Sequence, residues 1–275
     1  NGDFSIQFLV PKDIAYNYGN GRINYYAADE TNDYEANGFY TNFLIGGENP
    51  EFVIEDDGPE ITMYLNTPAF VSGDKVNENP VFMANVSDES GINTVGSGIG
   101  HDIILMLNQD PMTSCVLNNY FEFSIGSYKS GSVTYPLYNL PEGKHSLYFR
   151  VWDVLNNSSS KTIDFEVVKG LPPELYKTSV FPNPVQTSAR IMVSHDRPLS
   201  LFQSTVVISD LTGKIVRNIS NSVYTETDNS QVCDWDLKDN NGRRVASGIY
   251  VYRVTLTFTD GQVIYNSNKI IVSPL

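Results

Sequence analysis

The chain has 275 residues, among them 17 Tyr and 14 Phe, and a formal net charge of −14. This length allows two or three domains, and the acidity excludes nucleic acid as a partner because phosphate binding requires a positive surface. No apolar 3.6-residue period is present, whereas short apolar alternations bounded by Gly and Pro are frequent. The expected fold class is therefore all-β, with tandem immunoglobulin-like β-sandwich domains and almost no helix.

Residues 1–57 are expected to form a partial β domain. Strands are predicted at Phe4–Val10, Gly21–Ala28 and Phe39–Ile45, and Pro11 ends the first because Pro cannot donate to a ladder. So few strands cannot close a sandwich of about seven. We expect either that the remaining strands lie upstream, in a longer parent protein, or that the segment packs on the next domain.

Residues 58–169 follow a boundary at 55–59 (Glu-Asp-Asp-Gly-Pro) and are predicted to form an immunoglobulin-like β-sandwich. Seven strands in a segment of this length fit that fold. Trp152, on the sixth strand, is expected to be a core aromatic, and residues 153–160 form a polar turn. The predicted strands are Ile61–Leu65, Pro80–Val86, His101–Leu107, Tyr120–Ile125, Gly131–Tyr138, His145–Asp153 and Thr162–Val168.

Residues 170–176 contain Pro172-Pro173 and are predicted to be an extended, semi-rigid linker to a third unit, residues 177–275. Tight turns are expected at Asp210–Gly213, Asp239–Gly242 and Asp260–Gly261. One strand face is predicted from the alternation of Tyr250, Tyr252, Val254, Leu256 and Phe258. The predicted strands are Ser179–Phe181, Ser188–Ser194, Thr205–Asp210, Ile215–Ser220, Gln231–Leu237, Gly248–Thr259 and Gln262–Val272.

The charge is unevenly distributed between these units. Residues 1–170 carry 23 acidic and 8 basic side chains, whereas residues 171–275 carry 9 acidic and 10 basic ones. We attribute the acidity to solubility on an extracellular surface. Cys115 and Cys233 lie far apart, so no disulfide framework is indicated. The sequence shows no initiator Met, signal peptide or membrane-spanning run, and we expect it to be a piece of a longer protein.

The residues that could carry chemistry have stronger structural explanations. His101 and Cys115 could form a nucleophilic pair, but nothing in the sequence brings them together, and a buried Cys commonly acts as a small hydrophobe. His145 and His195 have no partner at zinc-ligand spacing. The glycine-rich segment 96–101 lacks the helix and Lys that a phosphate loop requires.

Acidic turns and aromatic strands are the other candidates. Asp56-Asp57 and the run Asp236–Gly242 could offer oxygens to Ca²⁺, but the bidentate Glu of an EF-hand is absent, and an Asx turn is the better interpretation. Strand aromatics could stack on sugars, although most are expected to be core or cross-strand pairs. The residues alone thus predict a non-catalytic β-sandwich array with no catalytic residue, cofactor or metal.

Four ordered stretches of the third unit carry a family resemblance: residues 180–185 (Val-Phe-Pro-Asn-Pro-Val), 208–216, 235–254 and 269–272. They resemble the C-terminal signal domain of proteins exported by the bacterial type IX secretion system. The resemblance implies a seven-stranded immunoglobulin-like sandwich that a shuttle β-barrel of the outer membrane recognises near its terminal strand. The signal-domain residues, expected to be mainly structural, are Pro182, Asn183, Pro184, Asp210, Gly213, Trp235, Asp236, Gly242, Gly248 and Tyr250.

Six segments upstream of the third unit carry a second and more specific resemblance. They lie at residues 10–14, 19–27, 43–47, 58–61, 88–94 and 98–102. They look like the C-terminal region of the sortase of that system, a gingipain-like cysteine peptidase of family C25. Such a sortase removes signal domains from cargo and joins cargo to anionic lipopolysaccharide. Its catalytic Cys and His belong to a caspase-like α/β domain, and this chain has no α/β pattern. We therefore carry over no catalytic residue and expect the catalytic domain upstream.

The resemblance also implies a location and partners. The region is expected on the extracellular side of the outer membrane, where its third unit anchors the enzyme to a PorV-like barrel and residues 1–170 position the catalytic domain. Other attachment-complex components and cargo are further expected partners. The expected partner-binding residues are Val263, Tyr265, Lys269, Ile270, Ile271 and Val272.

Two alternatives remain open from the sequence. One is a surface adhesin or carbohydrate-binding array that uses the same export signal, and its mark would be a glycan site on the acidic sandwich. The other is an enzyme in its own right, which would depend on the thiols of Cys115 and Cys233.

Overall fold

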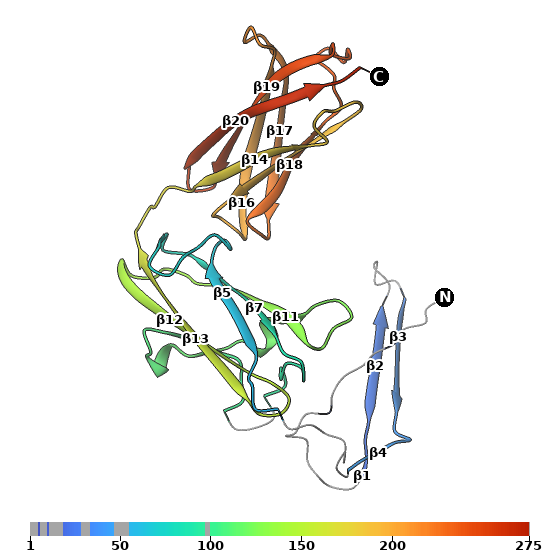
Figure 1. Cartoon of the computed structure of the whole chain (residues 1–275), viewed down its shortest axis with the longest axis vertical. Helices are drawn as coiled ribbons and strands as arrows, with labels where there is room; N and C mark the ends of the chain where they lie inside the picture. The colour runs from blue at the N-terminus through green and yellow to red at the C-terminus, as the bar shows by residue number, and fades with distance from the viewer. Residues whose placement is uncertain are drawn as a thin grey trace.

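A computed structural model describes residues 5, 10, 19–28, 34–46, 55–96 and 100–274. Apart from Ser5 and Val10, the predicted strand Phe4–Val10 lies outside the described residues, and so do residues 97–99 of the glycine-rich segment. Within these ranges the chain forms three β units in sequence order, as Figure 1 shows, and its helical content is two short 3₁₀ turns, Pro111–Thr113 and Asn118–Tyr120. The all-β, immunoglobulin-like fold class is confirmed. No helix in the described ranges has the length and apolar character needed to cross a bilayer.

The first unit consists of two antiparallel strand pairs. β2 (Ile23–Ala28) pairs with β3 (Glu35–Tyr40), and β1 (Gly19–Asn20) pairs with β4 (Leu44–Ile45). Nearly every residue of the β2–β3 hairpin is exposed, and Figure 1 shows it standing apart from the middle unit. Glu55, by contrast, is held against the middle unit, since its backbone carbonyl accepts from Asn157 Nδ2 at 2.9 Å.

The middle unit is a sandwich of two sheets. Their strand orders are β10–β11–β7–β5 and β6–β13–β12–β8–β9. Alternate residues of β12, namely Leu147, Phe149 and Val151, are buried between the sheets because successive strand residues face opposite sides. The strand bounds are β5 Glu60–Leu65, β6 Lys75–Val76, β7 Val81–Ser87, β8 Ile104–Leu107, β9 Cys115–Val116, β10 Phe121–Phe123, β11 Ser130–Pro136, β12 Gly143–Trp152 and β13 Ser158–Val167.

All seven strands predicted for this unit are present, with ends shifted by a few residues, and the two-residue strands β6 and β9 are additional. β13 begins at Ser158, inside the predicted polar turn. The prediction that Trp152 is a core aromatic is wrong. Its neighbour Val151 faces the core, so Trp152 points to the opposite face, where its ring lies 4.2 Å from that of His101.

The linker is held at both ends by hydrogen bonds. Gly170 N–H donates to Glu78 Oε2 of the middle unit at 3.1 Å, and Glu174 N–H donates to Asp196 Oδ1 of the third unit at 2.7 Å. The Arg197 guanidinium pairs with Asp196 and donates to the Leu171 carbonyl. β14 begins at Leu175, within the range that the sequence predicts as linker.

The third unit is a seven-stranded sandwich, matching the predicted strands in number and order. A three-stranded sheet, β14–β15–β18, packs on a four-stranded sheet, β17–β16–β19–β20. The predicted face of Tyr250 through Phe258 is confirmed, since all five alternating side chains are buried. The strand bounds are β14 Leu175–Phe181, β15 Ala189–His195, β16 Ser200–Ser209, β17 Ile215–Thr225, β18 Asn229–Trp235, β19 Gly248–Phe258 and β20 Val263–Val272.

Candidate functional site

The Pro182-Asn183-Pro184 segment is fastened to the terminal strand. Asn183 Oδ1 accepts from Ile271 N–H at 2.9 Å, and Asn183 Nδ2 donates to the Lys269 carbonyl at 3.2 Å. Val185 continues the contact, because its N–H donates to the Ile271 carbonyl at 2.8 Å. The Asn183 side chain therefore makes the hydrogen bonds that a neighbouring strand would make along the C-terminal part of the β20 edge. We call this set of contacts the Asn183 clip.

Removing the clip side chain is expected to loosen that edge. Asn183→Ala loses two hydrogen bonds, so we expect the free energy of unfolding of the third unit to fall by about 1–2 kcal/mol. The Ile271 amide should also exchange its hydrogen faster. Denaturant unfolding and hydrogen exchange measure the two effects. Asn218→Ala is the matched control, an exposed asparagine on β17; equal effects in both variants would contradict the role of the clip.

The predicted turn residues hold two tight turns. Asp210 Oδ1 accepts from Thr212 Oγ1, Thr212 N–H and Lys214 N–H, and the bond from the Thr212 hydroxyl holds the pKa of Asp210 below its usual value. Asp239 Oδ1 accepts from the backbone of Arg243 and Asn241, and the Arg243 bond lowers the pKa of Asp239. The Asx-turn interpretation of residues 236–242 is thus confirmed. Gly213 and Gly242 have φ of 87° and 78°, the left-handed region that glycine tolerates.

The second turn also covers a sheet edge. Asn240 N–H donates to the Val216 carbonyl at 2.9 Å, and Asn240 Oδ1 accepts from Asn218 N–H at 3.1 Å. These are the outward-facing groups of β17, the strand at the far edge of the four-stranded sheet. The sequence interpretation missed Asn240, whose only local signal is its place in an Asx turn. Both edges of this sheet are therefore closed in part by asparagine side chains.

Trp235 and Tyr250 lie in the core of the third unit. Trp235 is fully buried, its Nε1–H donates to the Lys238 carbonyl at 2.9 Å, and its ring packs edge-on against Tyr250 at 5.8 Å. The Tyr250 hydroxyl donates to the Ala246 carbonyl at 2.8 Å. Asp236 is exposed and pairs with Lys238 at 3.5 Å, and Gly248 begins β19 opposite Val272.

The expected partner-binding residues separate into two groups. Val263, Tyr265, Lys269 and Ile271 are exposed on the outer face of β20. The other two, Ile270 and Val272, are buried in the core, because the alternation of β20 turns even-numbered residues inward. Their inclusion as surface residues is therefore corrected, since a partner cannot touch them while the sandwich is closed.

A further residue, Arg253, belongs to this surface and was missed by the sequence interpretation. Its guanidinium lies 4.0 Å from the centre of the Tyr265 ring, a cation–π contact on the outer face. Strand alternation could have placed Arg253 on this face, but only the pairing of β19 with β20 brings it near Tyr265. The result is an aromatic and cationic patch at the edge of the sheet.

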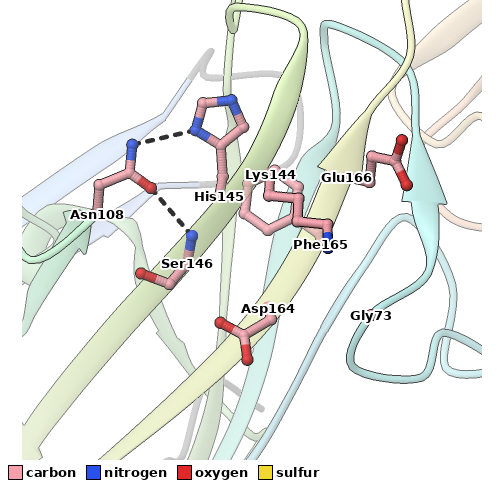
Figure 2. Close-up of a pocket in the computed structure, with 8 residues that line it drawn as sticks. All are labelled: Gly73, Asn108, Lys144, His145, Ser146, Asp164, Phe165 and Glu166. Atoms are coloured by element: carbon pink, nitrogen blue, oxygen red, sulfur yellow. Dashed lines mark hydrogen bonds between the residues drawn. The ribbon is translucent and has the colours of Figure 1, made fainter.

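The middle unit contains a shallow pocket, shown in Figure 2, around His145. Both imidazole nitrogens are engaged there, since Asn108 Nδ2 lies 3.1 Å from Nδ1 and the Pro141 carbonyl lies 2.8 Å from Nε2. Asn108 Oδ1 also accepts from Ser146 N–H at 3.0 Å. With its ring stacked on Phe165, this histidine supports the loop that carries Asn108. His145 is therefore engaged at both ring nitrogens and is not a free general base.

The two cysteines occupy different units and both are free thiols. Cys115 contacts the Thr113 carbonyl and the Tyr135 hydroxyl, whereas the ring of His101 lies against Trp152. Burial raises the pKa of Cys233 to about 12, which keeps this thiol protonated at neutral pH and unreactive as a nucleophile. Both cysteines therefore make packing contacts, and in the described part of the chain neither is paired with a histidine.

Comparison with known proteins yields two informative similarities. Residues 179–273 match the family described as the secretion system C-terminal sorting domain. The latent, dimeric PorU of Porphyromonas gingivalis is 35% identical across 98% of this chain and 25% of that chain, with a TM-score of 0.47. The chain therefore spans about a quarter of the length of PorU.

Two other solved structures are more distant. The fibronectin(III)-like modules of Clostridium thermocellum CbhA share 11% identity, covering 78% of this chain and 95% of that chain, with a TM-score of 0.27. The Ig1-2 module of the Drosophila receptor tyrosine phosphatase DLAR shares 7% identity, covering 79% and 100%, with a TM-score of 0.29. The comparison with curated protein sequences found no match.

Proposed function

Since residues 179–273 belong to the secretion system C-terminal sorting domain family and the chain is similar to the C-terminal region of PorU, we propose that it anchors and positions a type IX secretion sortase. A PorU-related role in type IX secretion and a secreted, cell-surface location follow from these similarities. The proposal goes further: the parent protein is a cysteine peptidase that removes signal domains from cargo and attaches cargo to anionic lipopolysaccharide. This chain contributes no catalytic residue to that reaction.

In this proposal the third unit is the anchor, and its partner is an outer-membrane β-barrel of the PorV type. The observation that supports it is the exposed patch on the outer face of β20, where the Val263 and Tyr265 side chains are 54% and 62% exposed. Apolar and aromatic side chains exposed together often mark protein interaction sites. Residues 171–275 carry 10 basic and 9 acidic side chains, so the third unit lacks the strong acidity of the upstream units.

The β2–β3 hairpin is the proposed contact with the catalytic domain. Tyr26, Phe39 and Tyr40 are 67%, 64% and 47% exposed, and a two-stranded hairpin is at best marginally stable alone in water. Packing against a further domain would bury these rings. The hairpin therefore supports a positioning role for the upstream part of the chain.

A pull-down with the purified barrel tests the anchor. Val263→Ser combined with Tyr265→Ser is expected to weaken binding by about tenfold or more, because exposed aromatic anchors dominate such interfaces. Both positions are exposed, so the fold should be retained, which circular dichroism checks.

Tyr224→Ser is the matched control for that experiment, because Tyr224 is 60% exposed on β17, at the opposite edge of the same sheet. It should bind the barrel as the wild-type chain does. The anchoring proposal fails if the β20 double variant also binds like the wild type.

A further inference from the structure

The outer edge of β20 has one open stretch. Ile271 N–H and the Ile271 and Lys269 carbonyls point away from β19, because they bond to Asn183 and Val185. By strand alternation, the backbone groups of Val263, Tyr265 and Ser267 point the same way. No described strand pairs with β20 on that side, and the single bridge there joins Val185 to Val272.

Part of each outer edge of this sheet is occupied. Asn240 covers β17 at Val216 and Asn218, and the Asn183 clip covers β20 from Lys269 onward. Natural sheets commonly block exposed edges in this manner, because an open edge is a template for another strand.

The clip stops short of Ser267. β14 approaches β20 next to this point, where Asn268 Nδ2 donates to the Thr178 carbonyl at 3.3 Å and Asn268 Oδ1 accepts from Lys269 N–H at 2.8 Å. Among the described residues, the outward backbone groups of Val263, Tyr265 and Ser267 have no hydrogen-bond partner.

We propose that the Val263–Ser267 edge of β20 is a strand-addition site, at which an extended segment of a partner protein continues the four-stranded sheet. This deepens the proposed function, on which it rests, by naming the backbone groups and the binding mode of the anchor. Backbone hydrogen bonds supply affinity in such complexes, and side-chain contacts supply specificity.

The surroundings of the edge define the chemistry of the added strand. Its side chains would lie beside Val263 and Tyr265 on the outer face, which favours β-branched or aromatic residues. Arg253 lies over the Tyr265 ring and Lys269 lies further along the strand, so a carboxylate on the added strand gains a charge partner. A second copy of this chain fits less well, since it would bring the same cations together.

A proline substitution at one outward-pointing amide of β20 tests the binding mode. Ser267→Pro removes an N–H that points away from β19, and proline is tolerated on edge strands at such positions. Ser267→Thr is the matched control because it keeps the N–H. We expect Ser267→Pro to weaken barrel binding by about tenfold or more while Ser267→Thr binds normally. If both variants bind equally well, strand addition is wrong although the anchor proposal stands.

A peptide probe keeps the test independent of the barrel. A short synthetic peptide that alternates valine and threonine around one aspartate should protect the amides of Val263, Tyr265 and Ser267 from hydrogen exchange. Replacing its aspartate by asparagine should weaken binding to the wild-type chain but not to a double variant, Arg253→Gln with Lys269→Gln, which lacks both cations. If these amides are not protected at a saturating concentration of the peptide, the strand-addition proposal is wrong. This outcome does not depend on whether the barrel binds. Dimerisation of the chain that Ser267→Pro abolishes would instead identify a second copy as the occupant.

Discussion

Trp235→Ala is expected to lower the free energy of unfolding of the third unit by about 3–5 kcal/mol, the usual cost of deleting a buried aromatic side chain. The ring is fully buried against Tyr250, and its indole N–H satisfies the Lys238 carbonyl. Since a domain of this kind is stable by only about 5–15 kcal/mol, the third unit should unfold at markedly lower temperature. Differential scanning calorimetry would show its transition shifted or lost.

Trp152→Ala in the middle unit is the control for that measurement. This indole is half-buried on the outer side of β12 and packs on His101, so its loss should cost less. Under the proposed anchoring role, an outer-membrane barrel should also bind Trp235→Ala poorly at temperatures where the third unit is unfolded. A Trp235→Ala chain that unfolds like the wild type would contradict the central place of this ring in the core.

Acidification is expected to destabilise the third unit through His195. The side chain is fully buried, and burial, reinforced by Arg197, lowers its pKa from 6.5 to about 4. Its Nδ1 accepts from Arg197 N–H at 3.1 Å, which requires the neutral ring. The unfolded chain takes up the proton first as the pH falls, so stability is full above pH 6.5 and is lost between about 6.5 and 4. The loss amounts to about 3 kcal/mol.

The pH dependence of the His195→Gln variant isolates this contribution. Glutamine cannot be protonated, so the difference between the two unfolding profiles should grow as the pH falls through that window. Asp196 opposes the trend, because burial raises its pKa and its protonation stabilises the fold at low pH, but it is present in both chains. His145→Gln serves as the matched control in the middle unit. Parallel profiles for the wild type and His195→Gln would refute the prediction.

The sequence pattern predicted the long strands because buried and exposed residues alternate along a strand that has one face in the core. The run from Tyr250 to Phe258 is the clearest case, with each second side chain buried. Two-residue strands carry no such period. Val76 of β6 pairs with Val167 of β13 through the fold alone, so the sequence contains no local sign of it.

The same alternation could have prevented two errors. Phe149 and Val151 face the core, so Trp152 had to face outward. Ile264, packed on the core, sets the parity of β20 and thereby places Ile270 and Val272 inside. Here an apolar side chain was given more weight than its position along the strand.

The contacts of the candidate site were largely beyond sequence reasoning. The family resemblance named Asn183 as a motif residue, but its bonds to Lys269 and Ile271 join segments at opposite ends of the third unit. Asn240 and Val216 meet in the same way. Such pairings depend on how the sandwich closes, and an asparagine in a turn looks alike whether or not a strand edge lies beside it.

The Asn183 clip also sets how late in synthesis the third unit can complete its fold. Asn183 and Ile271 are separated by 88 residues, so the ribosome adds Ile271 roughly 4–18 s after Asn183 at ~5–20 residues per second. During that interval β20 does not exist, and the sheet ends at β19. A polypeptide whose translation stops early therefore never closes this sandwich. Closure of this domain therefore requires translation through its last strand, which makes the fold itself a check on completed synthesis.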